Sequence, residues 1–297
     1  MSEKLSIGLL GFGEVGQILA SDLASSACFA YDLKFGDAAS VPSLAVGQSD
    51  TVMSCLNAVH LGRNANIVIS AVTAAQTLDA VLSILPQLKP GTWVMDMNSA
   101  SPGTKCKAAR CVEDAGGYYV EAAVMSPISP KRLHAPILLG GPHAAQFKPI
   151  GEALGFGSLS VFSDQLGKAS AAKMCRSVMV KGIEALLSES LISARHYGVE
   201  ATVLTSLNDL FPGPDWPKLA HYMIGRTLEH GQRRAEEMRE VAKTIAETGL
   251  EPQMSTAIAN RQDWAKSYPE LLQKTELEDL LDALVLIAND TKKGSAA

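Results

Sequence analysis

Three glycines after the first apolar run have the spacing needed to bring a phosphate close to the backbone. Residues 5–10 are apolar and lead directly into Gly11-Phe12-Gly13-Glu14-Val15-Gly16, which is followed by helix-forming residues to about Ser26. In such a unit the first glycine makes a tight turn, the second lets a pyrophosphate approach, and the third lets helix and strand pack closely. Because the motif lies between a strand and a helix, we predict a dinucleotide-binding turn.

Asp32 indicates which dinucleotide is bound. A second apolar run, residues 28–31, ends at Asp32, and an acidic residue about 20 positions after the first glycine accepts hydrogen bonds from the ribose of NAD. Its charge repels the 2′-phosphate of NADP, whereas Lys34 could accommodate that phosphate. We therefore expect NAD, with NADP as the alternative. The competing interpretation is that the glycines only form a turn and Asp32 only caps a strand.

The elements that position these residues follow from alternating patterns. Strand-like apolar runs span residues 66–72, 92–96, 118–124, 137–139 and 159–162. They alternate with predicted helices at about 74–85, 103–115 and 143–154. This alternation predicts an α/β fold with a doubly wound, mainly parallel sheet, a Rossmann domain. From about Ser163 long helical patterns take over. We expect a dinucleotide-binding domain over 1–165 and an all-α domain over 166–297.

Lys173 lies within the first long helical pattern, at about 164–196. Apolar residues recur there at three- and four-residue steps and define one buried face of the predicted helix: Leu166, Ala169, Val180, Ile183, Leu187, Leu191 and Ala194. We expect Lys173 and Arg176 to lie on the same face. The ammonium group of a lysine on such a buried face either extends to solvent, pairs with a carboxylate or faces a polar cavity. If burial or Arg176 lowers its pKa, Lys173 can act as a base near neutral pH.

The composition argues against several classes of protein. The chain has 297 residues, a hydrophobic content of 47% and a net charge of −5, so a nucleic-acid partner is not expected. The five cysteines lack the spacing of a metal site, which predicts free thiols and no bound metal. We find no run of about 18 apolar residues and no cleavage site, and we expect a cytoplasmic protein without a membrane partner.

Four blocks, in order, resemble the β-hydroxyacid dehydrogenases, which include 6-phosphogluconate and 3-hydroxyisobutyrate dehydrogenases. Residues 8–16 are similar to the family's GxxGxGxMG, and Asp96-Met-Asn98-Ser99 with Ser101-Pro102 is similar to its Asp-x-Ser-Thr segment. Residues 121–127, EAAVMSP, stand where the family has DAPVSGG, and residues 167–177 are similar to GxGxxxKxxxN. Blocks three and four, with residues 233–238, look most like a less characterised branch of the family.

The resemblance implies hydride transfer between a nicotinamide cofactor and a 3-hydroxy acid or a related hydroxylated molecule, with Lys173 as the general acid and base. It also implies that the all-α domain over 166–297 is a substrate and dimerisation domain, and that the protein is a homodimer. The expected cofactor-binding residues are Gly11, Phe12, Gly13, Glu14, Val15, Gly16, Asp32, Val72, Thr73 and Asn98. The expected substrate-binding residues are Ser99, Met125, Ser126, Ser177, His230 and Arg234.

Departures from the family pattern indicate a diverged substrate. Met125 replaces the loop serine, Ser126-Pro127 the paired glycines, Ala169 the second glycine, and Ser177 the asparagine. His230 and Arg234 lie four residues apart on one predicted helix face, which is either a solvated charged face or a cationic wall for an acidic substrate. Two alternatives remain open: an imine or keto reductase of the same architecture, and a catalytically silent dinucleotide sensor.

Overall fold

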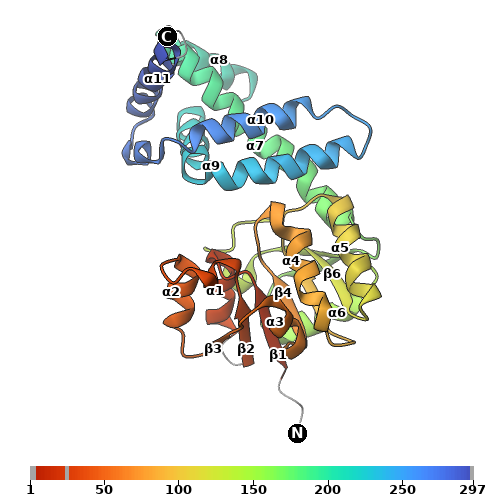
Figure 1. The fold of residues 1–297 in the computed structure, drawn as a ribbon. Helices are drawn as coiled ribbons and strands as arrows, with labels where there is room; N and C mark the ends of the chain where they lie inside the picture. Colours follow the sequence, from red (N-terminus) through yellow and green to blue (C-terminus); the bar gives the residue numbers. More distant parts are fainter. Residues whose placement is uncertain (1–4, 24–26, 295–297) are drawn as a thin grey trace. The chain divides into compact units, whose positions relative to one another are not determined.

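The computed structural model of the chain describes residues 5–23 and 27–294, in two compact units (Figure 1). The first unit contains the described residues up to Cys175 together with Lys243–Gly249, and the second contains Arg176–Ala242 and the described residues from Leu250 onward. The chain therefore passes from the first unit to the second within one helix, α7 (Lys168–His196).

An eight-stranded sheet forms the centre of the first unit, in the order β3-β2-β1-β4-β5-β6-β7-β8. All neighbouring strands are parallel except β6 and β7, which confirms the doubly wound, mainly parallel sheet. The strands are β1 (Ser6–Leu10), β2 (Ala27–Tyr31), β3 (Val52–Ser54), β4 (Ile67–Ser70), β5 (Trp93–Asp96), β6 (Tyr118–Val124), β7 (Ile137–Gly140) and β8 (Leu159–Ser163). The strand order reverses between β1 and β4, where such sheets bind ligands.

Six α-helices in the described part of this unit cover both faces of the sheet. They are α1 (Glu14–Asp22), α2 (Val41–Gly47), α3 (Ala58–Asn64), α4 (Thr77–Ile84), α5 (Pro102–Asp114) and α6 (Ala144–Ala153). One apolar cluster includes Leu19 of α1 and Phe147 of α6, and the other includes Leu61, Val81 and Ala108 of α3, α4 and α5. Ser26, the expected end of α1, lies outside the described residues.

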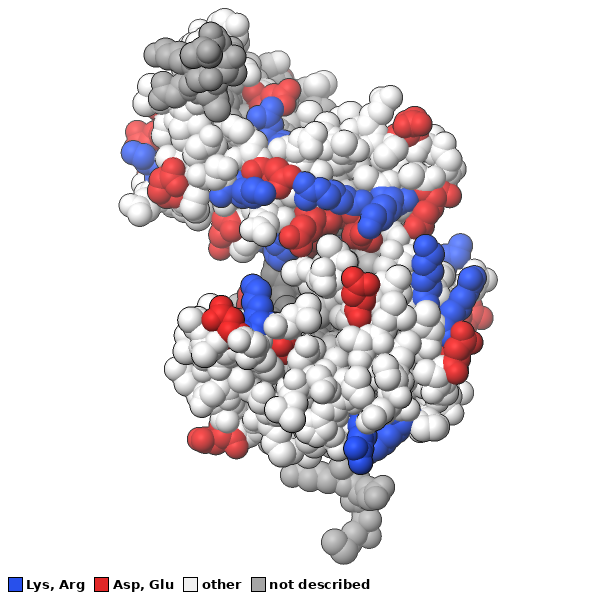
Figure 2. All heavy atoms as spheres, in the orientation of Figure 1, with Lys and Arg blue, Asp and Glu red and all other residues white. Residues whose placement is uncertain are grey.

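The second unit is helical, as the sequence predicts. It contains most of α7, then α8 (Glu200–Leu210), α9 (Trp216–Ala246, except its last turn), α10 (Gln253–Ala265) and α11 (Leu277–Gly294). Its apolar core draws on four of these helices, for example through Leu191, Ile224, Ala265 and Leu281. Figure 2 shows charged side chains of both signs gathered in a band on this unit, where Figure 1 draws α9. No helix within residues 5–23 and 27–294 is long and apolar enough to cross a membrane.

Candidate functional site

Two of the three glycines after β1 are required by the backbone. Gly11 has a φ of +98°, and a Cβ atom there would lie 2.4 Å from the carbonyl oxygen of Ala71. A Cβ atom on Gly16 would lie 2.3 Å from the carbonyl oxygen of Gly11. A side chain at either position would therefore force the turn apart, as expected for the turn-making and helix-packing glycines.

Gly13 leaves open space at the start of α1. A Cβ atom built on Gly13 would have no neighbour within 4 Å. Gly13 is the N-cap residue of α1 and has no side chain to bond the first N–H groups of the helix. Glu14 and Val15 begin the helix, and Phe12 is buried beneath the turn. The first N–H groups of a helix attract negative charge, so this turn fits a dinucleotide pyrophosphate.

The Asp32 side chain is hydrogen-bonded to the same turn. Its Oδ2 accepts a hydrogen bond of 2.7 Å from the backbone N–H of Phe12, and its Oδ1 accepts one of 2.9 Å from the backbone N–H of Lys34. The carboxylate thus caps the 3-10 turn Leu33–Gly36 and holds the glycine turn against the end of β2. A negative charge remains at the place where a Rossmann fold binds an adenosine ribose.

Val72 lies next to both Gly11 and Asn98 at the carboxyl edge of the sheet, and Thr73 follows it in the chain. Asn98 is buried, and its Oδ1 accepts a 2.7 Å hydrogen bond from the N–H of Val72 while its Nδ2 donates to Ser70 Oγ at 2.9 Å. Its carboxamide therefore ties the end of β5 to the end of β4 and fixes the loop that carries Val72 and the exposed Thr73. Ser99, the next residue, is half-buried.

A buried charged cluster supports this loop, and the sequence reasoning missed it. Asp96 accepts hydrogen bonds from Lys105 Nζ at 2.8 Å and from the Tyr119 hydroxyl at 2.6 Å, and each of the three residues is at most 1% exposed. Burial, followed by the neighbouring Asp96 carboxylate, raises the pKa of Tyr119 well above its usual value. Asp96 Oδ1 also accepts the N–H of Asn98, so the cluster positions the residue that holds Val72.

Ser101 caps α5. Its hydroxyl oxygen accepts the N–H of Thr104 at 3.2 Å, and its hydroxyl donates to Glu247 Oε1 at 2.8 Å. Glu247 also accepts the N–H of Gly103. A carboxylate at the N-terminus of a helix is stabilised by the helix dipole, so Glu247 anchors the end of α9 to α5 inside the first unit.

Glu121 fixes the start of α7, the helix that carries Lys173. The carboxylate is fully buried and accepts hydrogen bonds from the backbone N–H groups of Gly167, at 2.9 Å, and Ser170, at 2.5 Å. In the sheet Glu121 is paired with Asp96, the last residue of β5. The beginning of α7 is therefore attached at the carboxyl edge that also carries Gly11, Val72 and Asn98.

Lys173 is half-buried on α7, one turn after Ser170. The expectation that Arg176 shares its buried face is wrong, because Arg176 is exposed. A step of three residues turns about 300° around a helix, which is enough to carry Arg176 off the buried face. Met125 and Ser126 are half-buried in the loop after β6, where the Met125 N–H donates to the carbonyl oxygen of Pro136 at 2.8 Å.

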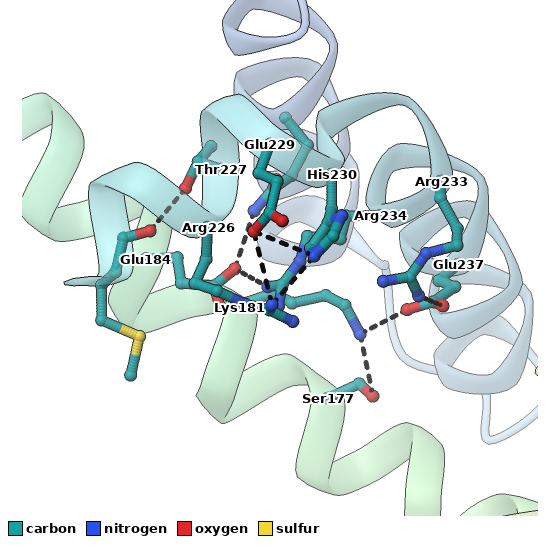
Figure 3. A network of polar contacts seen from close by, with 12 residues as sticks. Ser177, Lys181, Glu184, Arg226, Thr227, Glu229, His230, Arg233, Arg234 and Glu237 are labelled. Carbon is teal, nitrogen blue, oxygen red and sulfur yellow. Dashed lines mark hydrogen bonds and ion pairs between the residues drawn. The ribbon is translucent and has the colours of Figure 1, made fainter. Parts of the chain in front are cut away.

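In the second unit, Ser177 belongs to a network of polar contacts (Figure 3). The Lys181 ammonium donates to Ser177 Oγ at 3.3 Å and pairs with Glu237 Oε2 at 2.9 Å. Arg233 pairs with the other oxygen of Glu237 at 2.5 Å. Sequence reasoning did not single out Lys181, although it lies two helical turns after Lys173.

His230 and Arg234, both on α9, have different surroundings. Arg234 is 7% exposed and is hydrogen-bonded to Glu184, which also accepts from Gln262 Nε2 at 3.1 Å. His230 Nε2 lies 2.8 Å from Arg226 Nη1, and burial and the Arg226 charge lower the pKa of this histidine. The charge of Arg234 is thus balanced inside the helical unit, and the substrate role of both residues stays a prediction.

Comparisons with known proteins agree with this geometry. The family described as the NAD binding domain of 6-phosphogluconate dehydrogenase matches residues 6–155, and a domain of unknown function, DUF1932, matches residues 194–265. A solved conserved hypothetical protein from Sinorhizobium meliloti is 34% identical, with a TM-score of 0.72 over 94% of this chain and 96% of the other.

Two named dehydrogenases are more distant. The 2-(hydroxymethyl)glutarate dehydrogenase of Eubacterium barkeri is 24% identical over 78% of this chain and 84% of that protein. The 3-hydroxyisobutyrate dehydrogenase of Mycobacterium tuberculosis, solved with L-serine, is 16% identical, with a TM-score of 0.69 over 95% of this chain and 99% of that one, and shares the fold. The matched family spans more than half of the chain, and the chain belongs to the β-hydroxyacid dehydrogenase family.

Proposed function

We propose that the protein is a nicotinamide-dependent dehydrogenase that oxidises the hydroxyl group of a 3-hydroxy acid or a related hydroxylated small molecule. The supporting observation is that the glycine turn and the start of the Lys173 helix are attached to one sheet edge. Gly11 follows β1 directly, and Glu121, paired with the last residue of β5, holds the first turn of α7. Ligands of such folds bind at this edge.

Lys173 is the proposed acid and base of the reaction. A bound nicotinamide supplies the hydride acceptor. The substrate carbon loses a hydride and its hydroxyl oxygen loses a proton to the Lys173 amine, so that a carbonyl forms. In the reverse direction the Lys173 ammonium returns the proton to the carbonyl oxygen.

NAD is the proposed cofactor, because the negative charge of Asp32 lies at the end of β2 next to the glycine turn. A 2′-phosphate would bring additional negative charge to this carboxylate. On the substrate side we assign Ser99, Met125, Ser126 and Ser177, whose small polar groups and apolar side chain suit a short hydroxy acid.

A homodimer is proposed through the helical unit. Large apolar side chains are exposed on its helices, for example Met179 (66%) and Leu186 (60%) on α7 and Tyr222 (59%) on α9. Exposed apolar surface of this kind is typical of a contact face. Light scattering after size exclusion tests this proposal, and a monomer at micromolar concentration would contradict it.

A turnover screen tests the proposed function. Wild-type protein is mixed with NAD or NADP and with 3-hydroxyisobutyrate, 2-(hydroxymethyl)glutarate, L-serine and sugar acids, and cofactor reduction is followed at 340 nm. We expect one of the acids to be oxidised with NAD. A matched screen supplies NADPH with cyclic imines. Turnover of imines alone would favour the reductase alternative, and binding of NADH without turnover of any compound would favour the sensor.

A further inference from the structure

Lys173, Ser177 and Lys181 follow one another at four-residue steps along α7. Residues four apart on a helix lie on the same face, so the three side chains form one polar stripe. The proposed function uses Lys173 and Ser177 and leaves Lys181 unexplained. Lys181 is only 8% exposed, and a lysine that is so deeply buried needs specific partners.

The partners of Lys181 hold its ammonium group in place. Nζ lies 2.9 Å from Glu237 Oε2 and 3.3 Å from Ser177 Oγ. Glu237 is itself held by Arg233, one turn earlier on α9. Figure 3 shows the Lys181 side chain extending between Ser177 and Glu237. The Glu237 carboxylate balances the charge of the Lys181 ammonium and holds it in place. The ammonium therefore donates to the Ser177 oxygen from a fixed position.

The Ser177 hydroxyl accepts a hydrogen bond from a lysine and makes no hydrogen bond to the backbone of its own helix, which the structure describes throughout. Its oxygen accepts from Lys181, and its own proton has no acceptor among the described residues. Three other helical hydroxyls of this unit donate to the carbonyl oxygen one turn back: Ser188 to Glu184, Thr205 to Ala201 and Thr227 to Met223. The Ser177 proton is therefore available to water or to a bound ligand. Donation from an ammonium group to a hydroxyl oxygen also strengthens that hydroxyl as a donor.

We infer that Lys181 is a positioning residue, which turns the Ser177 hydroxyl into a hydrogen-bond donor for a carboxylate or carbonyl oxygen of the substrate. The inference rests on the proposed function, which puts the substrate beside Lys173, one turn before Ser177. A Ser177–Lys181 pair thus takes the place of the asparagine of the related dehydrogenases. The pair favours a substrate that has an acceptor oxygen next to the Ser177 hydroxyl, such as the carboxylate of an acid or the carbonyl of a keto acid.

A double-mutant cycle tests the coupling between the two residues. The variants are Ser177→Ala, Lys181→Met and the double variant, and KM and kcat are measured with saturating NAD and the best acid of the screen. We expect Ser177→Ala to raise KM roughly 10- to 100-fold, as for a lost hydrogen bond to a charged group. Lys181→Met is expected to raise KM about tenfold in the wild type and less than about twofold in the Ser177→Ala background.

Two further variants separate positioning from a general effect on folding. Lys181→Arg keeps a charged donor and is expected to have a KM between those of wild type and Lys181→Met. Lys266→Met removes an exposed lysine, which pairs with Asp263 at 3.0 Å, and is expected to leave KM and kcat unchanged. NADH affinity, measured by fluorescence, is expected to stay the same in every variant.

The outcomes distinguish this inference from the proposed function. Non-additive KM values support the coupling of Lys181 to Ser177. Additive values, or a Lys181→Met protein with wild-type KM, would overturn the inference and leave the dehydrogenase assignment standing. A wild-type protein that binds NADH but oxidises none of the acids would overturn both.

Discussion

The Asp32 carboxylate accepts a hydrogen bond of 2.7 Å from the backbone N–H of Phe12, which lies between Gly11 and Gly13 of the turn. Asp32 therefore has a structural role in the turn in addition to its proposed contact with the ribose. A substitution that removes the whole carboxylate tests both roles at once, whereas an isosteric amide removes the charge and keeps one acceptor oxygen for the turn.

Asp32→Asn is expected to change cofactor preference while keeping one of the two hydrogen bonds from the backbone. The amide oxygen still accepts the N–H of Phe12, the bond from the N–H of Lys34 is lost, and the loss of negative charge removes repulsion of the 2′-phosphate. We expect the ratio of the NADP and NAD dissociation constants to fall about tenfold. Asp32→Ala, as the comparison, weakens both cofactors and lowers the melting temperature. Equal effects of Asp32→Asn on the two cofactors would show that Asp32 does not distinguish them.

Gly11→Ala and Gly13→Ala form a matched pair with opposite expected effects. Gly11 has positive φ and no room for Cβ, so Gly11→Ala is expected to destabilise the fold by at least about 2 kcal/mol. Gly13 has an extended backbone and open space, so Gly13→Ala is expected to melt near the wild-type temperature.

Cofactor affinity gives the second half of this comparison. The Cβ of Gly13→Ala would occupy the space proposed for the pyrophosphate, and we expect the NADH dissociation constant to rise at least about tenfold. Calorimetric titration measures the affinity, and thermal unfolding measures the stability. Unchanged NADH binding by a folded Gly13→Ala protein would remove this turn from the cofactor site.

Replacing the two side chains that contact the buried Asp96 is expected to lower the stability of the protein by different amounts. Lys105→Met leaves a buried carboxylate without its counter-charge and is expected to cost about 3–5 kcal/mol of unfolding free energy. Tyr119→Phe removes one hydrogen bond and is expected to cost about 1–3 kcal/mol. Urea unfolding measures both values. A smaller loss for Lys105→Met than for Tyr119→Phe would contradict the assigned charge pair.

The five cysteines are expected to react with iodoacetamide at very different rates. Burial raises the pKa of Cys28 and Cys55 to about 11 each, so at pH 8 only about one thiol in a thousand at these positions is a reactive thiolate. Cys175 is exposed on α7. Peptide mass spectrometry after short labelling at pH 8 should therefore find Cys175 modified first. Equally rapid labelling of Cys28 would contradict its burial.

Raising the pH gives a control for this assignment. The thiolate fraction of a thiol with a raised pKa grows tenfold per pH unit until the pKa is reached. Labelling of Cys28 in the folded protein should therefore keep rising from pH 8 to pH 10. A rate at Cys28 that levels off by pH 9 would indicate an ordinary thiol pKa.

Strong local patterns made much of the first unit predictable from the sequence. The buried runs that became β1, β4, β5 and β6, and the glycine turn, depend on residues that are neighbours in the chain. Strand β3 and helices α2 and α3 are not predicted, because they are only three to seven residues long; in α2, moreover, only Pro42 is buried. The pairing of β7 antiparallel to β6 also depends on packing rather than on a local pattern.

Side-chain partners far apart in the sequence were the least predictable part of the site. Lys105 and Tyr119 carry no motif that relates them to Asp96, and Glu237 reaches Lys181 from another helix. Arg176 was assigned to the wrong face because a three-residue step was treated like a four-residue step. Motif spacing thus predicts roles for Lys173 and Ser177, whereas the contact between Lys181 and Glu237 is seen only in the folded chain.

Turnover by Lys173→Ala is the most direct test of the proposed mechanism. With the best acid of the screen and saturating NAD, we predict that kcat falls at least about 100-fold, because the substrate hydroxyl loses its base. The NADH dissociation constant should stay within about twofold of wild type, since the glycine turn is unchanged. A Lys173→Ala protein with near-normal kcat would contradict the account.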